Sequence, residues 1–449
     1  MLHFLSSDSL QTTQAWRALF LAALGLGVAL KVWLAWRQMR HVRAHRGAVP
    51  PAFVHTVSLH AHQKAADYTV AQSHFSLLNL LLGTLLLLGW TLGGGLQTLH
   101  GLMGQWFHSP MLQQLGLLAG FALIGSLLDL PLDWYRTFRL EARFGFNTST
   151  LVLWLGDWFK NMALGAVIGL PLAALILWLM QQAGSLWWLW AWAVWAGFGL
   201  LMTVIYPTWI APLFNRFEPL QDPELVQRVT TLMQRCGFAA KGLYVMDGSK
   251  RSAHANAYFT GLGRAKRVVF FDTLLSKLQP GEVDAVLAHE LGHFKHRHIQ
   301  KRLLLGLALS LTGFALLGWL YGQDWFYAGL GVAGARNGPH AALALLLFAL
   351  AAPVFTLFAA PIAAASSRKH EFEADAFAAQ HSAASDLSSA LLKLYNDNAA
   401  TLTPDPLYVR FYYSHPPASE RLAHLNGLAA GLAGTGSAHA AAWATPARG

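Results

Sequence analysis

Residues 287–298, LAHELGHFKHRH, place four histidines and one glutamate in a single short segment. His289 and His293 are four positions apart, so a helix would carry both imidazoles on one face, about one turn apart. That separation suits two ligands of a tetrahedral Zn²⁺ ion, each about 2.0–2.1 Å from the metal. Glu290 can lie beside an open coordination position, where it takes a proton from metal-bound water and passes it to the leaving amine. The spacing therefore indicates a zinc-dependent hydrolase.

A third ligand is needed, and the acidic segment 370–377, HEFEADAF, offers it. Glu371 and Asp375 are four positions apart and share one helical face, whereas Glu373 projects to nearly the opposite side. We predict that Glu371 is the third ligand. Asp375 is expected behind the metal, where it accepts a hydrogen bond from a zinc-bound imidazole and fixes the tautomer of that ring.

The other histidines and the single cysteine favour one Zn²⁺ per chain. Cys236 alone builds neither a disulfide framework nor a cysteine zinc cage. His296 and His298 lie off the ligand face or beyond its reach and are expected on the surface. A di-iron desaturase or hydroxylase would also place histidines between membrane spans. Such an enzyme needs several histidine-rich boxes, whereas the later histidines here are isolated, so this alternative is disfavoured.

The composition places this site in a membrane protein. Of the 449 residues, 55% are hydrophobic and 12% are charged, which is typical of a chain that crosses a bilayer several times. The net charge of +10 comes from basic residues in loops between apolar stretches, which argues against a nucleic-acid partner. Seven stretches can cross a hydrocarbon layer of about 30 Å as helices. They are Ala15–Trp36, Phe75–Leu96, Leu112–Leu130, Met162–Met180, Leu186–Ile205, Leu303–Leu320 and Ala341–Ala360.

The distribution of arginine predicts the orientation of these spans. Residues 37–46, after the first span, are rich in arginine, whereas residues 97–111 contain no lysine or arginine. By the positive-inside bias the first loop is cytoplasmic and the N-terminus lies outside. Alternation then brings residues 206–302 and the segment after Pro361 to the cytoplasmic side, so that HELGH and the acidic helix can form one site.

This topology predicts a mainly α, polytopic membrane protein with a cytosolic α+β, zincin-like metallopeptidase domain. Within that domain we predict a helix at Glu224–Cys236, strands at Gly242–Met246 and Arg267–Asp272, and a helix that begins near Gln279 and carries HELGH. The regions are 1–205 with five membrane helices, 206–302 with HELGH, 303–361 with two membrane helices, 362–426 with the rest of the catalytic domain, and 427–449, an Ala/Gly-rich tail expected to be disordered.

Six segments occur together and in order: Leu130–Asn147, Pro212–Leu220, Asp247–Gly261, Ala285–His298, Ser366–Ala378 and Tyr413–Leu422. In this set the chain resembles the type I CAAX prenyl proteases, which are integral-membrane zinc metallopeptidases. The resemblance covers most of the chain. It implies seven transmembrane helices that enclose a large water-filled chamber, capped on the cytosolic side by the zinc domain, and it supports Glu371 as the third ligand.

The resemblance also implies roles for two residues that the spacing alone leaves in a loop and a turn. Asn256, in HANAYF, would hold the substrate backbone, and His415, in SHPP, would donate a hydrogen bond to the developing oxyanion. One such donor is typically worth about 3 kcal/mol of barrier. The strand Arg267–Asp272 is expected to pair with an extended substrate by edge addition.

The implied partners are a lipid bilayer and a peptide or protein substrate that can carry a lipid, with the oligomeric state left open. Short outer loops and no dilysine retrieval signal suggest a bacterial inner membrane with the catalytic domain facing the cytoplasm. An HtpX-like membrane quality-control protease is the related alternative, although its chains are shorter and have fewer spans. A non-enzymatic holdase for lipidated peptides is disfavoured by the intact HExxH.

Overall fold

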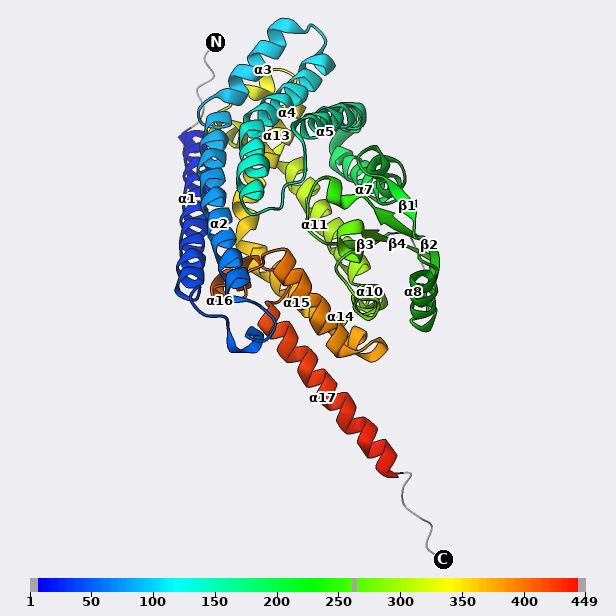
Figure 1. Ribbon diagram of the computed structural model, residues 1–449. Coiled ribbons are helices and arrows are strands. Elements are labelled where there is room, and N and C mark those ends of the chain that lie inside the picture. The colour runs from blue at the N-terminus through cyan, green and yellow to red at the C-terminus, as the bar shows by residue number, and fades with distance from the viewer. Residues whose placement is uncertain (1–6, 261–264, 443–449) are drawn as a thin grey trace, which may run out of the picture.

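The computed structural model describes residues 7–260 and 265–442 of the chain (Figure 1). Among them seven helices are long and apolar enough to cross a membrane, which confirms the predicted number. The second ends at Trp90, six residues before the predicted boundary, because the chain turns at Gly94, whose φ is +77°. The seven helices are Leu10–Ala44, Leu59–Trp90, Pro110–Glu141, Leu151–Gln182, Gly184–Leu213, His298–Leu320 and Ala341–His381.

Three of these spans contain a π-helical turn, a local widening of the helix that is frequent at functional sites. The elements of the membrane part are α1 (Ser7–Ala44), α2 (Leu59–Trp90), α3 (Gly95–Trp106), α4 (Pro110–Tyr135), η2 (Arg136–Glu141), α5 (Leu151–Leu164), η3 (Gly165–Gly169), α6 (Leu170–Gln182), α7 (Trp187–Ile205), η5 (Tyr206–Ile210), α11 (His298–Leu320), α12 (Asp324–Gly329) and α13 (Ala341–Thr356).

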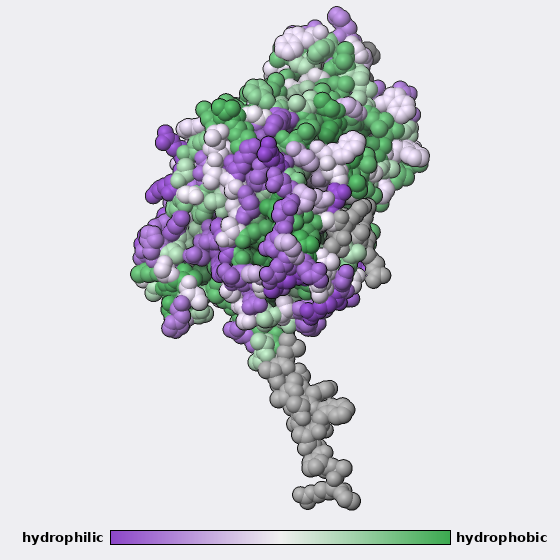
Figure 2. Space-filling model, turned by 45° about the vertical axis from the view of Figure 1, so that its right-hand side comes forward, coloured by the Kyte–Doolittle hydropathy of each residue, from purple (hydrophilic) through white to green (hydrophobic). Residues whose placement is uncertain are grey.

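The spans pack most closely at the end that carries α3 and α12. There Phe20 of α1, Leu117 of α4, Leu177 of α6 and Leu347 of α13 are fully buried. Toward the catalytic domain, a cavity of about 840 Å³ lies between the membrane helices and the domain. On the face shown in Figure 2, hydrophobic residues dominate the upper part and hydrophilic residues gather over the lower part, as expected for a membrane-embedded half and a solvated half.

The catalytic domain contains a four-stranded sheet with the order β1-β2-β4-β3. Its strands are β1 (Phe217–Pro219), β2 (Ala239–Met246), β3 (Ala257–Thr260) and β4 (Ala265–Phe271). The two predicted strands correspond to β2 and β4, which are parallel neighbours. The expectation that a substrate pairs with the strand at residues 267–272 is wrong, because β2 and β3 already occupy both edges of β4. Among the described strands, β3 and β1 are the edges.

Two helices bring the predicted metal ligands together. The helix α10 (Pro280–Lys295) begins with a capping box between Gln279 and Glu282, as its Pro and acidic first turn suggest. The helix α14 (Ala360–His381) continues the last membrane span into the catalytic domain and packs against α10. The other helices of the domain are α8 (Pro223–Arg235), α9 (Asp272–Leu275), α15 (Ala384–Asp397), α16 (Pro406–Tyr412) and α17 (Ala418–Ala442).

The prediction of a disordered tail is wrong for most of its length. The helix α17 runs through Ala442 and projects away from the body of the molecule (Figure 1). Alanine and leucine, which rank highest in helix propensity, together outnumber the scattered glycines in this helix. Residues 443–449 lie outside the described part of the chain.

Candidate metal centre and active site

His289 and His293 lie one turn apart on α10, and Glu371 approaches them from α14. The two Nε2 atoms are 3.3 Å apart. Glu371 Oε2 is 3.4 Å from Nε2 of His289, and Oε1 is 3.4 Å from Nε2 of His293. His289 and Glu371 are buried, with 7% and 2% of their surface exposed. The structure thus brings together the three side chains that the sequence predicts as ligands.

The spacing of these three side chains fits a tetrahedral metal ion. Ligand atoms about 2.0–2.1 Å from a tetrahedral zinc ion lie about 3.3–3.4 Å from one another. Here the two Nε2 atoms are 3.3 Å apart, and each lies 3.4 Å from a different oxygen of the Glu371 carboxylate. Glu371 Oε2 is also buried without a hydrogen-bond partner among the described residues, which is rare for an oxygen so deep in a protein. A cation bound between the three side chains would be the missing partner of this oxygen.

The second ring nitrogen of His289 is held by a buried ion pair. Asp375 Oδ1 lies 2.8 Å from Nδ1 of His289, and Asp375 is fully buried. Arg421 of α17 donates from Nε to Asp375 Oδ2 at 2.9 Å. Burial opposes a charge on His289, yet its contacts with Asp375 and Glu371 raise the pKa of the imidazole to about 9. The surroundings of His289 therefore favour positive charge at the position where a metal would bind.

The prediction that His298 lies on the surface is wrong, whereas His296 is exposed as expected. His298 is 1% exposed, and its Nδ1 lies 2.9 Å from Nδ1 of His293. Its Nε2 lies 2.8 Å from Glu373 Oε2. The cause is Arg297, whose φ of +57° ends α10 and turns the chain back, so that His298 does not continue the spiral of that helix.

The three residues predicted to act on the substrate lie at different places around the three predicted metal ligands. Glu290 follows His289 on α10 and is half-buried. The His415 side chain is 64% exposed, and its Nε2 lies 3.5 Å from Glu371 Oε1. Asn256 is exposed and directly precedes the edge strand β3, and its side-chain oxygen accepts a hydrogen bond from the Ala257 amide at 2.8 Å.

Arg421 is the residue of this centre that the sequence reasoning missed. It lies in the segment YSHPPASERL, six positions after His415, and it is 5% exposed. A buried arginine requires a carboxylate partner, but the pairing with Asp375 spans 46 positions of the chain. The sequence signal that could have identified it is Asp375, an acidic residue on the helix of Glu371 for which no counter-charge was predicted.

Comparison with known proteins agrees with this geometry. Residues 38–216 match the family described as CAAX prenyl protease N-terminal, five membrane helices, and residues 219–429 match Peptidase family M48. A CAAX prenyl protease 1 homolog from Arabidopsis thaliana is 31% identical over 417 residues, which are 90% of this chain and 96% of the relative. The chain belongs to the CAAX prenyl protease 1 family.

Other members of the CAAX prenyl protease 1 family give the same result. The homolog from Homo sapiens is 31% identical over 93% of this chain and 97% of its own. The crystal structure of S. mikatae Ste24p aligns with a TM-score of 0.85 and 30% identity, covering 91% of this chain and 99% of that chain. As a member of the CAAX prenyl protease 1 family, the protein is a metallopeptidase and an integral, multi-pass membrane protein.

Proposed function

We propose that this protein is a membrane-embedded zinc endopeptidase that cleaves near the C-terminus of prenylated, CAAX-type substrates. The observation that carries this proposal is the triangle of His289, His293 and Glu371, in which the two Nε2 atoms lie 3.3 Å apart and each lies 3.4 Å from an oxygen of the largely buried carboxylate. Relatives that match more than nine-tenths of this chain bear the name CAAX prenyl protease 1 homolog. One Zn²⁺ per chain is the metal that two imidazoles and a carboxylate most often hold at a catalytic site.

The side chains around the triangle have separate tasks in hydrolysis. When bound, the metal supplies the Lewis acidity that activates water and polarises the peptide carbonyl. Glu290 takes the proton of the attacking water and delivers it to the leaving amine. His415 donates a hydrogen bond to the carbonyl oxygen as that oxygen gains negative charge. Asp375 accepts the Nδ1–H of His289 and thereby leaves Nε2 free as a ligand.

The substrate backbone is held by the edge of the sheet. Among the described strands β3 pairs only with β4, so its other edge is available for an extended peptide. Asn256 stands at the start of β3, and its side-chain oxygen is engaged by Ala257. The amide nitrogen of Asn256 is then the group that donates to a substrate carbonyl.

We further propose that the catalytic domain faces the cytoplasm. Arginine-rich residues 37–46 lie at the catalytic end of α1, whereas residues 97–111, at the other end of the spans, carry no lysine or arginine. A cysteine introduced in residues 97–111 should react with a membrane-impermeant thiol reagent added from outside. The assignment to a bacterial inner membrane rests on the short outer loops and stays a prediction.

The first experiment is cleavage of a farnesylated CAAX peptide by the purified protein, beside the same peptide without the lipid. Zinc content is measured for the wild type and for Glu290→Gln. Cleavage that is lost in Glu290→Gln while zinc stays bound supports the proposal. Full activity of Glu290→Gln would contradict the assigned base, and two irons per chain would contradict the metal. Cleavage of unprenylated membrane proteins alone would favour the quality-control alternative.

A further inference from the structure

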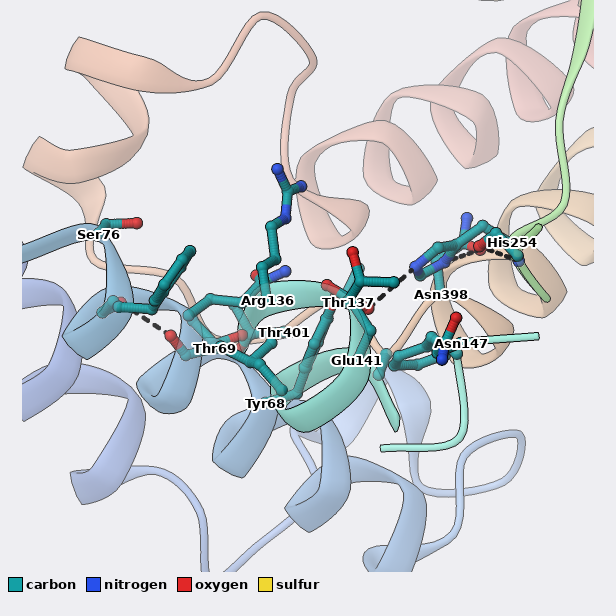
Figure 3. A pocket seen from close by; sticks show the side chains of 18 of the residues that line it. Tyr68, Thr69, Ser76, Arg136, Thr137, Glu141, Asn147, His254, Asn398 and Thr401 are labelled. Carbon is teal, nitrogen blue, oxygen red and sulfur yellow. Dashed lines mark hydrogen bonds and ion pairs between the residues drawn. The ribbon is translucent and has the colours of Figure 1, made fainter. Parts of the chain in front are cut away.

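A polar cavity of about 840 Å³ adjoins the metal centre and has no task in the mechanism above. It lies between α2, η2 and the chain segments on either side of α16 (Figure 3). Pro417 lines the cavity and is two residues from His415, so the two Cα atoms lie within about 7 Å of each other. A peptide that passes the metal therefore has this cavity within its reach.

Most charged groups of this cavity already have partners within the protein. Glu141 accepts hydrogen bonds from the Tyr68 hydroxyl at 2.9 Å and lies 3.8 Å from His254 Nε2. Asp133 accepts a hydrogen bond from Trp154 Nε1 at 2.8 Å. Both carboxylates of the cavity therefore have hydrogen-bond partners within the protein.

Arg251, another charged residue that lines the cavity, is also bound by protein partners. Arg251 donates from Nε and Nη2 to the two carboxylate oxygens of Asp157, at 2.8 and 3.1 Å, and from Nη1 to Asn215 at 2.8 Å. A bidentate pair of this kind has little capacity left for a further anion.

Arg136 is the exception. Within the described part of the chain its guanidinium makes no hydrogen bond or ion pair, and Figure 3 shows it extended away from Glu141. Arg136 is the first residue of the π-helical turn η2. Across the cavity, Ala399 has a φ of +46°, a conformation that costs free energy for a residue with a β-carbon and that gathers at functional sites. Two unusual backbone features thus border the unpaired cation.

These groups select the chemistry of a ligand. The remaining polar lining of the cavity consists largely of hydroxyl and amide groups, which complement a charged or polar ligand and do not suit an isoprenoid chain. A guanidinium matches a carboxylate in shape, because its parallel N–H groups meet both oxygens. The free end of a peptide chain offers such a carboxylate.

We propose that Arg136 binds the C-terminal carboxylate of the peptide substrate in this cavity. The inference rests on the proposed function, because it concerns the part of the substrate that leaves after cleavage. It implies that the enzyme measures the position of the scissile bond from the end of the chain, whereas the lipid lies elsewhere. A substrate without a free C-terminus then loses affinity.

The test uses two farnesylated CAAX peptides that are identical except that one ends in a carboxylate and the other in a carboxamide. The ratio of their kcat/KM values is measured for the wild type, Arg136→Gln, Arg136→Lys and Arg139→Gln. Arg139 is the matched control, because it is exposed, lies three residues further along the same turn and lines a different cavity. The zinc content of each variant reports that the protein is folded.

We expect the wild type to prefer the carboxylate peptide at least about tenfold, the effect of one charged hydrogen bond. Arg136→Gln should bring the ratio close to one, mainly by raising KM for the carboxylate peptide. Arg136→Lys should give an intermediate ratio. Arg139→Gln should keep the wild-type ratio. The free product tripeptide should inhibit the wild type, and its amide should not. A wild-type ratio of one, or an unchanged ratio in Arg136→Gln, overturns the carboxylate site. Failure of the wild type to cleave either peptide instead overturns the proposed function.

Discussion

Gly292 of α10 lies so close to Ala374 of α14 that a β-carbon added at Gly292 would stand 3.0 Å from the Cα atom of Ala374. Gly292 directly precedes the ligand His293, and Ala374 directly precedes Asp375. The distance between the two helices is therefore set at the metal centre itself. Any side chain at position 292 must push the histidine pair away from the helix that carries Glu371.

Replacing Gly292 by alanine should weaken zinc binding, because the added methyl group meets backbone atoms that have no room to give. Overpacked sites typically cost about 1–3 kcal/mol, more than the roughly 1 kcal/mol that alanine gains over glycine in a helix. Zinc affinity is measured by competition with a chelator. Gly306→Ala, on α11, is the matched control, because nothing lies within 4 Å of its β-carbon. Equal affinities in the two variants would contradict this packing argument.

Replacing His298 by alanine should lower zinc affinity by about 10–100-fold, the usual effect of removing a side chain that orients a metal ligand. The reason is the 2.9 Å contact between the Nδ1 atoms of His298 and His293. His296→Ala serves as the control, since that histidine is exposed and only two residues away. If both variants bind zinc as the wild type does, His298 does not orient the ligand.

Replacing Asp375 by asparagine should destabilise the fold by about 3–5 kcal/mol, because buried Arg421 would lose its hydrogen-bonded counter-charge and keep only Glu371, 3.8 Å away. Thermal unfolding in detergent, with and without zinc, measures the loss. The control is Asp397→Asn. Asp397 pairs with Lys277 at 3.4 Å in a partly exposed ion pair, for which a cost below about 1 kcal/mol is typical. A similar small effect in Asp375→Asn would refute the account of the buried pair.

The contact between His254 and Glu141 predicts a pH dependence of stability. The Glu141 carboxylate, 3.8 Å from Nε2 of His254, raises the pKa of His254 above its ordinary value of 6.5, against the opposing effect of burial. A raised pKa in the folded state gives a stabilisation that is complete below about pH 6.5 and is lost as the pH rises through the raised value. Because His254 is more than one-third exposed, the effect should stay below about 1 kcal/mol.

Thermal unfolding of the wild type and of Glu141→Gln between pH 5.5 and 9 tests this prediction. The wild type should be the more stable protein at the acid end, and the difference should shrink as the pH rises. A difference that grows with pH has the wrong sign and would exclude the His254–Glu141 pair as its source. Tyr68 donates to either side chain at position 141, so its hydrogen bond should be common to both proteins.

The parts of the fold that were predictable depend on short-range patterns. Apolar stretches of sufficient length identify all seven spans, and the spacing of four in HELGH places two imidazoles on one face. The placement of HELGH and Glu371 on the same side of the membrane follows from the number of spans between them. Each of these inferences depends on residues that are neighbours along one helix, or on the fact that every span moves the chain to the other side of the membrane.

The parts that were missed depend on contacts between distant segments or on one unusual backbone angle. The pairing of Arg421 with Asp375 and the place of β4 inside the sheet are set by tertiary packing. The burial of His298 depends on the left-handed conformation of Arg297, an arrangement that arginine seldom adopts. The helix beyond residue 427 was not predicted, because an Ala/Gly-rich composition is typical of low-complexity segments even though alanine has the highest helix propensity.

The two helices that supply the ligands are also continuous with the membrane. Glu371 belongs to the span Ala341–His381, and α10 leads through one turn into the span His298–Leu320. A metal bound by residues of both helices would therefore join the sixth and seventh membrane helices. A bilayer of a different thickness changes the tilt of such helices. A tilt of one span against the other would change the distances between Glu371 and the histidines of α10. We therefore expect the rate of hydrolysis to depend on the thickness of the surrounding bilayer.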